Sequence, residues 1–452
     1  MYVFIVPQIH ISRYSMLQKE LYLLTVEEST GKGLKKSTFE INDIAAEILL
    51  KFNGTMTYNE IINFFSEKYK ENMNEVNEKV NSLIEAMKLK YGFSLREQKE
   101  KYEHKIKYIE YENFYPTVVS LEVTNLCNLQ CQHCYGEYGI EKRIEFPKGK
   151  LEKVFNDLVK IGVMTVEITG GDPSVYAHIV ETIELAFKAG IKSVVLLTNG
   201  VKISEELLKT LIKYKRQIYV QVDLHSLDEE YYNWFTKSKG NLSIVKENIK
   251  KLVKNQIPIR VVSIITPKNY KELEDIADWC YQKDVNFFAT SVVTELGRAK
   301  EDNGLIFKDP DTLNEYLQKY SMLNEKYPGF ISKVDDVRED ISCGALFSQV
   351  SINPKGDIKL CTMDTGEYFK FDFGNVFDDT IKEIYDRNRE FLNEFINMDY
   401  PDAITTCKEC ENALFCHRCY LRGMIQAKRM KDRCRWFKKY KNSIINLKFN
   451  II

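Results

Sequence analysis

Residues 123–135 read Val123-Thr-Asn-Leu-Cys127-Asn-Leu-Gln-Cys131-Gln-His-Cys134-Tyr135 and are the most informative segment of the chain. It continues a β-rich run, Val118–Val123, and places three cysteines in the spacing C-x3-C-x2-C. Three thiolates so closely spaced suit a [4Fe–4S] cube, and they leave its fourth iron open to an exogenous ligand. A zinc loop is the competing interpretation, but zinc loops are usually built from C-x2-C pairs with four protein ligands. The loop therefore indicates an iron–sulfur cluster at the end of a strand.

From Thr117 onward, short strand-like runs alternate with amphipathic helical segments. Repeated βα units predict an α/β fold with a parallel sheet covered by helices, either doubly wound or a partial barrel. Functional residues are then expected at the carboxyl ends of the strands. The expected strands are 118–123, 164–168, 193–197, 218–224, 259–264 and 286–290, and the helices between them include 151–161, 179–189, 204–214 and 270–282.

Polar turns follow three of these strands. Gly170-Gly171-Asp172 ends the second, Thr198-Asn199-Gly200 the third, and Asp223 lies at the end of the fourth. Glycines allow a close approach of the backbone to a ligand, and a carboxylate can hold an ammonium group. Each turn alone is a weak signal, since most such turns only connect a strand to a helix. Together at one edge of a sheet, they predict a binding site.

Composition narrows the class of protein. The 452 residues suggest two or three domains, and a net charge of −1 argues against a general binder of nucleic acid or anionic membranes. We find neither a secretory signal nor an apolar run long enough to span a membrane, so a cytoplasmic protein is expected. Thiols stay reduced there, and the eleven cysteines are better interpreted as metal ligands than as disulfides. Cys280, inside a helical segment, fits no ligand pattern and is expected to fill the core.

The cysteine loop and the polar turns resemble the radical S-adenosylmethionine (radical SAM) superfamily. The resemblance implies a partial (β/α)6 barrel, with Cys127, Cys131 and Cys134 as the catalytic cluster ligands. Asp172 stands where the family has Glu in the turn that binds the methionine amino group, and Asp223 stands where many relatives have Ser. The S-adenosylmethionine contacts so implied are His133, Gly170, Gly171, Asp172, Thr198, Asn199, Asp223, Ser263 and Arg298.

The cysteine-rich tail resembles a SPASM domain, the auxiliary-cluster module of radical SAM enzymes that modify peptides. The resemblance implies one cluster with four protein ligands and a second with three, whose open iron could take a substrate thiolate. Cys419 departs from the pattern, since it follows Cys416 one residue early. The competing interpretation is a zinc ribbon. The first set is Cys407, Cys410, Cys416 and Cys434, and the second is Cys343, Cys361 and Cys419.

Residues 1–90 contain early strands and then three helical segments, expected at 41–52, 58–69 and 76–89. They are similar to the RiPP recognition element, a winged-helix α+β module that binds the leader of a precursor peptide as an added strand. A DNA-binding winged helix is the alternative, but no strongly basic helix supports it. The expected organisation is 1–90 for this module, 91–115 for a linker, 116–304 for the barrel, and 305–452 for a bridging region and the SPASM domain.

Together these resemblances imply a radical SAM/SPASM maturase of a ribosomally made, cysteine-containing peptide, which forms thioether crosslinks of the sactipeptide or ranthipeptide kind. S-adenosylmethionine and three [4Fe–4S] clusters are the implied cofactors, and a flavodoxin or ferredoxin is the implied electron donor. No nucleic acid or membrane partner is expected. Carbon–carbon crosslinking, formylglycine-type oxidation and, from another class, a non-catalytic metal-binding regulator remain as alternatives.

Overall fold

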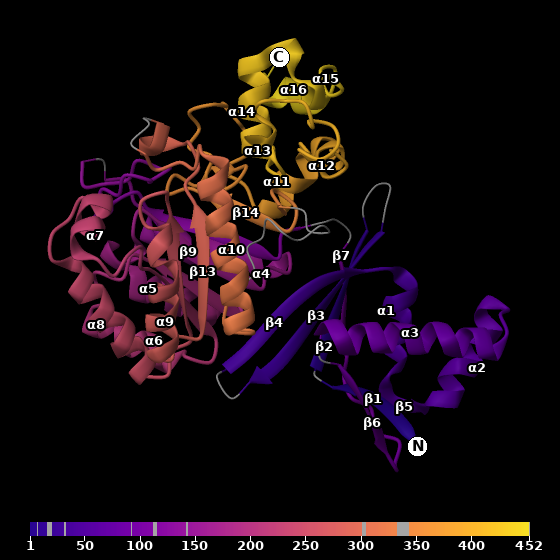
Figure 1. Cartoon of the computed structure of the whole chain (residues 1–452). Helices are drawn as coiled ribbons and strands as arrows, with labels where there is room; N and C mark the ends of the chain where they lie inside the picture. The colour runs from indigo at the N-terminus through magenta and orange to yellow at the C-terminus, as the bar shows by residue number, and fades with distance from the viewer. Residues whose placement is uncertain are drawn as a thin grey trace. The chain divides into compact units, whose positions relative to one another are not determined.

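The computed structural model (Figure 1) describes residues 1–6, 8–15, 20–30, 33–91, 93–111, 115–141, 143–300, 304–331 and 343–451. The chain divides into two compact units, Met1–Phe114 and Tyr115–Ile452, and each is described by itself. Among the described residues, no helix has the length and hydropathy that a membrane crossing requires.

The first unit is an α+β module with two small sheets. One sheet has the order β5-β1-β6 and is antiparallel, and the other has the order β4-β3-β2-β7. Its elements are β1 (Tyr2–Val6), β2 (Gln8–Ser15), β3 (Glu20–Thr30), β4 (Gly33–Ile41), α1 (Asp43–Lys51), β5 (Asn53–Thr57), α2 (Tyr58–Tyr69), α3 (Met73–Tyr91), β6 (Ser94–Gln98) and β7 (Lys107–Tyr111).

Local sequence explains the helices of this unit. Thr57 caps α2 and forms a capping box with Glu60, each side chain bonded to the other's backbone. The apolar faces of α1, α2 and α3 pack in one core with β1 to β3, where Phe52 and Phe65 are almost fully buried. The expected helix 58–69 agrees with α2 residue for residue.

The segment 91–115, expected to be a linker, contains strands that belong to the first unit. β6 pairs with β1, and β7 pairs in parallel with β2. Both strands are short and mostly exposed or half-buried, so their charged sequences show no regular alternation. The first unit therefore extends to Phe114 rather than to residue 90.

The second unit contains an eight-stranded sheet of order β13-β12-β11-β10-β9-β8-β14-β15. The six strands from β8 to β13 are parallel and follow one another along the chain, and helices flank them in Figure 1. The elements are β8 (Val118–Thr124), α4 (Lys148–Lys160), β9 (Thr165–Gly170), η1 (Pro173–Val175), α5 (Ile179–Ala189), β10 (Ser193–Thr198), α6 (Glu205–Lys213), β11 (Ile218–Asp223), α7 (Glu229–Thr236), α8 (Asn241–Lys254), β12 (Ile259–Ile265), η2 (Tyr270–Glu272), α9 (Leu273–Gln282), β13 (Phe287–Val292) and η3 (Gly297–Lys300).

These elements confirm the expected α/β class, and α5 has the expected bounds. Alternate residues of β8 to β13 pack against the helices, and Cys280 of α9 is fully buried in that core, as expected. The opposite face of the first strand is polar: Ser120, Glu122 and Thr124 point the other way, because side chains alternate along a strand.

The C-terminal part contributes two strands that the sequence did not reveal. β14 (Gln349–Ile352) pairs in parallel with β8, and β15 (Ile358–Lys359) pairs antiparallel with β14. The cysteine-rich region is thus joined to the barrel strand that leads into the cysteine loop. The remaining helices are α10 (Pro310–Lys326), α11 (Ile381–Arg387), α12 (Arg389–Ile396), α13 (Ala413–Cys416), α14 (Tyr420–Met430), η5 (Lys431–Arg433), α15 (Arg435–Lys438) and α16 (Ile444–Phe449).

Candidate functional site

The three cysteines of the loop after β8 lie together at the carboxyl edge of the sheet. Cys127 is buried, while Cys131 and Cys134 are half-buried. Burial, together with the charges of Asp172 and Cys134, raises the pKa of the Cys127 thiol to about 12. Cys131 experiences the charges of both Cys127 and Cys134. A site that disfavours thiolates at Cys127 and Cys131 is one where bound iron would compensate the negative charge.

Arg298 and Gly297, which follow β13, hold this loop in place. The Arg298 guanidinium donates from Nε to the Cys131 carbonyl at 2.8 Å and from both terminal nitrogens to the Tyr138 carbonyl at 3.0 Å. Gly297 has φ +55°, and a Cβ there would lie 2.4 Å from the Cys134 carbonyl oxygen. Arg298 was expected to contact S-adenosylmethionine. In the structure its guanidinium donates these hydrogen bonds to the cysteine loop.

The Gly170-Gly171 turn packs against the same loop. Gly171 N–H donates to the Thr124 carbonyl at 2.7 Å, and Asp172 N–H donates to the Leu126 carbonyl at 2.8 Å. A Cβ on Gly170 would lie 2.1 Å from the Thr124 oxygen, and one on Gly171 2.2 Å from the Leu126 oxygen. The two glycines therefore permit a close approach of two strand ends, whereas the sequence suggested a close approach to a ligand.

The Asp172 carboxylate is buried and occupied by the protein itself. It accepts hydrogen bonds from the backbone and hydroxyl of Ser174, from Thr198 Oγ1, and from Asn199 N–H at 2.7 Å. These donors favour the ionised form, although burial has the larger effect and raises the pKa of Asp172. In this arrangement Asp172 ties the ends of β9 and β10 together, and its oxygens have little capacity left for the ammonium group that the family resemblance assigned to it.

Asn199 links this network to the first cysteine. Its side-chain Nδ2 donates to Asn128 Oδ1 at 2.7 Å and lies 3.7 Å from Cys127 Sγ, within hydrogen-bonding range for sulfur. Its Oδ1 accepts from Val201 N–H, which fixes the orientation of the amide. Asn199 thus contacts Cys127, one of the three expected cluster ligands.

Three further residues were expected to contact the cofactor: Asp223, Ser263 and His133. Burial, with a smaller contribution from the charge of Asp172, raises the pKa of Asp223, at the end of β11, to about 7. Ser263 is fully buried and donates to the Leu224 carbonyl, so its hydroxyl joins β12 to β11. His133 stacks on Phe235 of α7 at 4.6 Å, and burial lowers its pKa to about 3, so the ring is neutral at pH 7. Asp223 is the member of this set best placed to accept hydrogen bonds from a ligand.

Cys343, Cys361 and Cys419 form a second group, although they are far apart in sequence. Burial raises the pKa of the Cys361 thiol, and the charges of Cys419 and Cys343 add to the shift. Cys343 is exposed, while Cys361 and Cys419 are half-buried. Cys361 follows β15 by two residues, so the pairing of β14 with β8 sets its position relative to the barrel.

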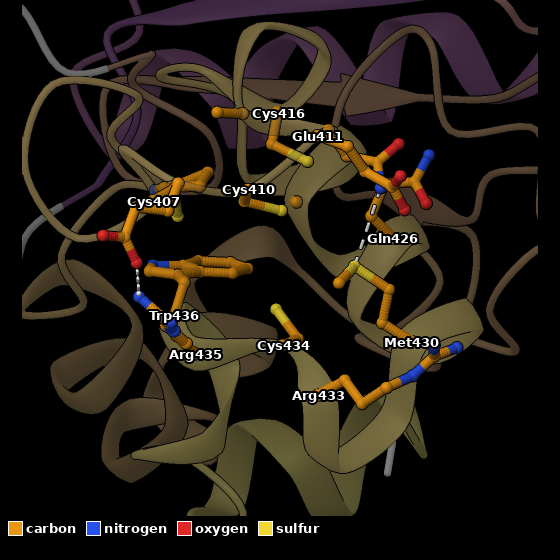
Figure 2. Close-up of a pocket in the computed structure, with 15 residues that line it drawn as sticks. Cys407, Cys410, Glu411, Cys416, Gln426, Met430, Arg433, Cys434, Arg435 and Trp436 are labelled. Atoms are coloured by element: carbon orange, nitrogen blue, oxygen red, sulfur yellow. Dashed lines mark hydrogen bonds and ion pairs between the residues drawn. The ribbon is translucent and has the colours of Figure 1, made fainter.

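The third group, Cys407, Cys410, Cys416 and Cys434, surrounds a cavity of about 310 Å³ (Figure 2). In Figure 2 the sulfur atoms of Cys410, Cys416 and Cys434 point toward one another across it, and Trp436 covers one side. Burial raises the pKa of Cys416 to about 12, and its largest charge partner is Cys434. All four cysteines line this cavity, and four is the number of protein ligands that one [4Fe–4S] cube takes.

The three groups of cysteines are suitable ligands for [4Fe–4S] cubes. Among the described residues, no three His, Cys, Asp or Glu side chains converge on one point as the ligands of a single ion do. A cube requires no such convergence, because each cysteine binds a different iron. Residues Cys127, Cys131 and Cys134 would hold the first cluster, and the other two groups would hold one cluster each.

Comparison with known proteins now decides the family. The radical SAM superfamily matches residues 121–280, and SPASM, an iron–sulfur cluster-binding domain, matches residues 343–411. The chain is a radical SAM protein with a SPASM domain. These two matches span the first cysteine loop, the expected cofactor contacts through Ser263, and the auxiliary cysteines from Cys343 to Cys410. S-adenosylmethionine and multiple [4Fe–4S] clusters are accordingly its cofactors.

Relatives of this radical SAM protein include AlbA of Bacillus subtilis (strain 168), the "antilisterial bacteriocin subtilosin biosynthesis protein", which is 26% identical over 404 residues, or 88% of each chain. A GTP 3',8-cyclase of Alkaliphilus oremlandii (strain OhILAs) is 27% identical over 58% of this chain and 86% of its own. Streptococcus suis SuiB bound to S-adenosylmethionine superimposes with a TM-score of 0.61 at 15% identity, covering 94% of this chain and 96% of its own; SuiB bound to its precursor peptide SuiA gives 0.60 at 16%, covering 94% and 97%. The SuiB likeness shows the fold alone.

Two buried residues of this radical SAM protein were not singled out from the sequence. Glu122 of β8 and Lys359 of β15 form a direct ion pair, with side chains only 4% and 11% exposed. Lys359 also donates to the Thr362 carbonyl at 2.9 Å. Alternation along β8 indicates that Glu122 faces away from the helices, but no sequence signal predicts its partner, because 237 residues separate the two.

Proposed function

We propose that this radical SAM enzyme matures a ribosomally synthesised, cysteine-containing precursor peptide by forming thioether crosslinks between a cysteine sulfur and a carbon of an acceptor residue. The observation that carries the proposal is the similarity to AlbA, which extends over 88% of both chains and so includes regions outside the shared barrel. The similarity to a GTP cyclase is confined to 58% of this chain, so the barrel does not specify the substrate.

The described residues support a division of labour within the enzyme. When bound, the first cluster and S-adenosylmethionine supply a 5′-deoxyadenosyl radical that takes hydrogen from the acceptor residue. Arg298 and the Gly170-Gly171 turn hold the loop that carries Cys127, Cys131 and Cys134. Cys343, Cys361 and Cys419 form a set with three cysteines, whereas the cavity in Figure 2 has four. We assign the incomplete set to the substrate thiolate.

The partners belong to the same proposal. Binding of a leader peptide is assigned to the first unit, where an edge strand can accept an added strand through backbone hydrogen bonds. A flavodoxin or ferredoxin in the cytoplasm would supply the reducing electron. SuiB has been crystallised with its precursor peptide, which makes a peptide partner reasonable for a chain of the same fold.

Anaerobic reconstitution tests the proposal. The purified enzyme should contain roughly twelve irons per chain, as three cubes require. With reductant it should form 5′-deoxyadenosine, and a short cysteine-containing peptide encoded by a neighbouring open reading frame should lose the mass of two hydrogens per crosslink. Cys127→Ala should abolish 5′-deoxyadenosine and lower the iron content by roughly four.

Cys280→Ala is the matched control, because this buried cysteine belongs to none of the three groups; it should retain iron and activity. Peptide of unchanged mass despite formation of 5′-deoxyadenosine would contradict crosslinking. A carbon–carbon crosslink loses the same mass but leaves the peptide thiol free to alkylate, whereas formylglycine-type oxidation consumes a thiol without joining two residues.

A further inference from the structure

The Glu122–Lys359 pair joins β8, the strand that leads into the first cysteine loop, to β15, the strand that leads into Cys361. The electrostatic effect of Glu122 reaches Tyr135, which also experiences the charges of Cys134 and Cys361. Tyr138 and Glu122 each influence the pKa of the other. One buried carboxylate therefore lies near both the radical-cluster loop and the incomplete auxiliary set.

A buried ion pair adds little to the stability of a fold, because removing both charges from water costs about as much free energy as their mutual attraction supplies. Here the pair joins β8 to β15, two strands that are already connected through the backbone pairing of β14. Lys359 lies two residues before Cys361 and is a positive charge that lowers the pKa of that thiol, whereas Asp364 raises the same pKa by more. This position suggests a role for the pair in the chemistry instead.

A thiol entering this region must lose its proton to bind iron, and a thiolate buried without a counter-ion would be costly. The Glu122 carboxylate can take the proton, and the Lys359 ammonium is already in place to compensate the thiolate. The S–H bond breaks with its electron pair left on sulfur, an O–H bond forms on Glu122, and the net charge of the buried site does not change. No oxidant or reductant is needed for this step.

On this basis, which rests on the proposed function, we propose that Glu122 is the residue that accepts the proton of the substrate cysteine as its thiolate binds beside Cys361, with Lys359 as the counter-ion. The groups that face Glu122 are consistent with this role. Lys359 and Tyr138 favour its ionised form, Asp364 disfavours it, and burial raises its pKa overall, which makes the carboxylate a better proton acceptor.

The test measures the number of protons released when a thiol binds, rather than catalytic turnover. Reconstituted full-length enzyme is titrated with N-acetyl-L-cysteine amide at pH 7, with the cluster absorption and EPR spectra reporting thiolate binding. Calorimetry in two buffers of different ionisation enthalpy gives the protons released. A free thiol is almost wholly protonated at this pH, so thiolate binding without a protein acceptor releases about one proton per thiol. The wild type should release almost none.

Glu122→Gln should release about one proton per thiol and require at least tenfold more thiol for half-saturation at pH 7. Glu167→Gln is the matched control: Glu167 lies on the adjacent strand β9 and bonds to Ser120 and Gln349, so this variant should behave as the wild type. If Glu122→Gln fails to fold or to bind iron, the wild-type measurement still decides.

Release of about one proton by the wild type, or a Glu122→Gln variant that matches Glu167→Gln, would overturn the role of Glu122. Neither result affects crosslinking by the wild type, which is measured separately on the peptide. A wild type that shows no spectral change with the thiol would contradict the substrate site itself, and the role of Glu122 would fall with it.

Discussion

Single residues at the strand ends make contacts that their local sequence does not predict. The turn Gly170-Gly171-Asp172 suggests a cofactor contact, yet the structure gives Asp172 to Ser174, Thr198 and Asn199. A glutamate, longer by one methylene, could reach past these donors, whereas the shorter aspartate side chain stays among them. The sequence therefore predicts a carboxylate at this edge of the sheet, but not which groups donate hydrogen bonds to it.

Asp223 yields a prediction at this scale. Its pKa is about 7 in the folded protein, above its ordinary value of 3.8, because burial disfavours the charged form. The folded state thus retains a proton that the unfolded chain releases, and the contribution of this group to the free energy of unfolding falls as pH rises from about 3.8 to about 7. Above pH 7 its contribution changes no further.

Urea unfolding of the metal-free chain between pH 5 and pH 8 measures this slope. Asp223→Asn removes the titrating group, so the difference in stability between the wild type and the variant should shift in favour of the variant as pH rises. The control is Asp228→Asn, which replaces the aspartate that caps the N-terminus of α7. A difference between Asp223→Asn and wild type that is constant with pH would show that Asp223 is already ionised at pH 5.

At the scale of elements, sequence periodicity predicts the strands and helices well and the contacts between them poorly. The bounds of α2 and α5 agree with expectation because each helix carries its own amphipathic pattern and its own terminal signals. β14, β15, β6 and β7 are two to five residues long, too short to show a period. β6, β7 and β14 pair with strands far along the chain, and β15 pairs with the neighbouring β14.

The junction of β9 with the cysteine loop gives a prediction at this scale. Gly170→Ala introduces a Cβ at φ +129°, 2.1 Å from the Thr124 carbonyl oxygen, so the turn and the loop after β8 must move apart. We expect the iron content to fall by roughly four per chain, since one cube depends on this loop. Iron analysis and EPR of the reduced protein measure the loss.

Gly149→Ala, in the first turn of α4, is the matched control, because no atom lies within 4 Å of the added methyl group. That variant should retain its iron. A Gly170→Ala variant with wild-type iron content and wild-type affinity for S-adenosylmethionine would show that the close approach of these two strand ends is not needed to position the cluster.

At the scale of the whole molecule, the chain consists of two compact units, and only the second contains cysteine. If the first unit binds the leader of the precursor, a chain that begins at Tyr115 should still bind iron and form 5′-deoxyadenosine. It should need at least tenfold more peptide for half-maximal crosslinking, because it lacks the binding energy of the leader, about 1.4 kcal/mol for each factor of ten.

Peptide titrations with both chains measure this difference, and a peptide without its leader is the control, since the two chains should treat it alike. Equal dependence of both chains on the full-length peptide would remove leader binding from the first unit. Loss of iron from the shorter chain would instead give the first unit a part in holding the clusters.

The sequence by itself determined the α/β class, the cysteine loop and the number of cysteines available for clusters, because helical period, strand alternation and ligand spacing are local properties of the chain. Only the tertiary structure decides which cysteines meet, that Arg298 and Asp172 hydrogen-bond to the cysteine loop and to the neighbouring strand ends, and that Glu122 is paired with Lys359. Those outcomes depend on contacts between segments distant in sequence, and local patterns carry no information about such contacts.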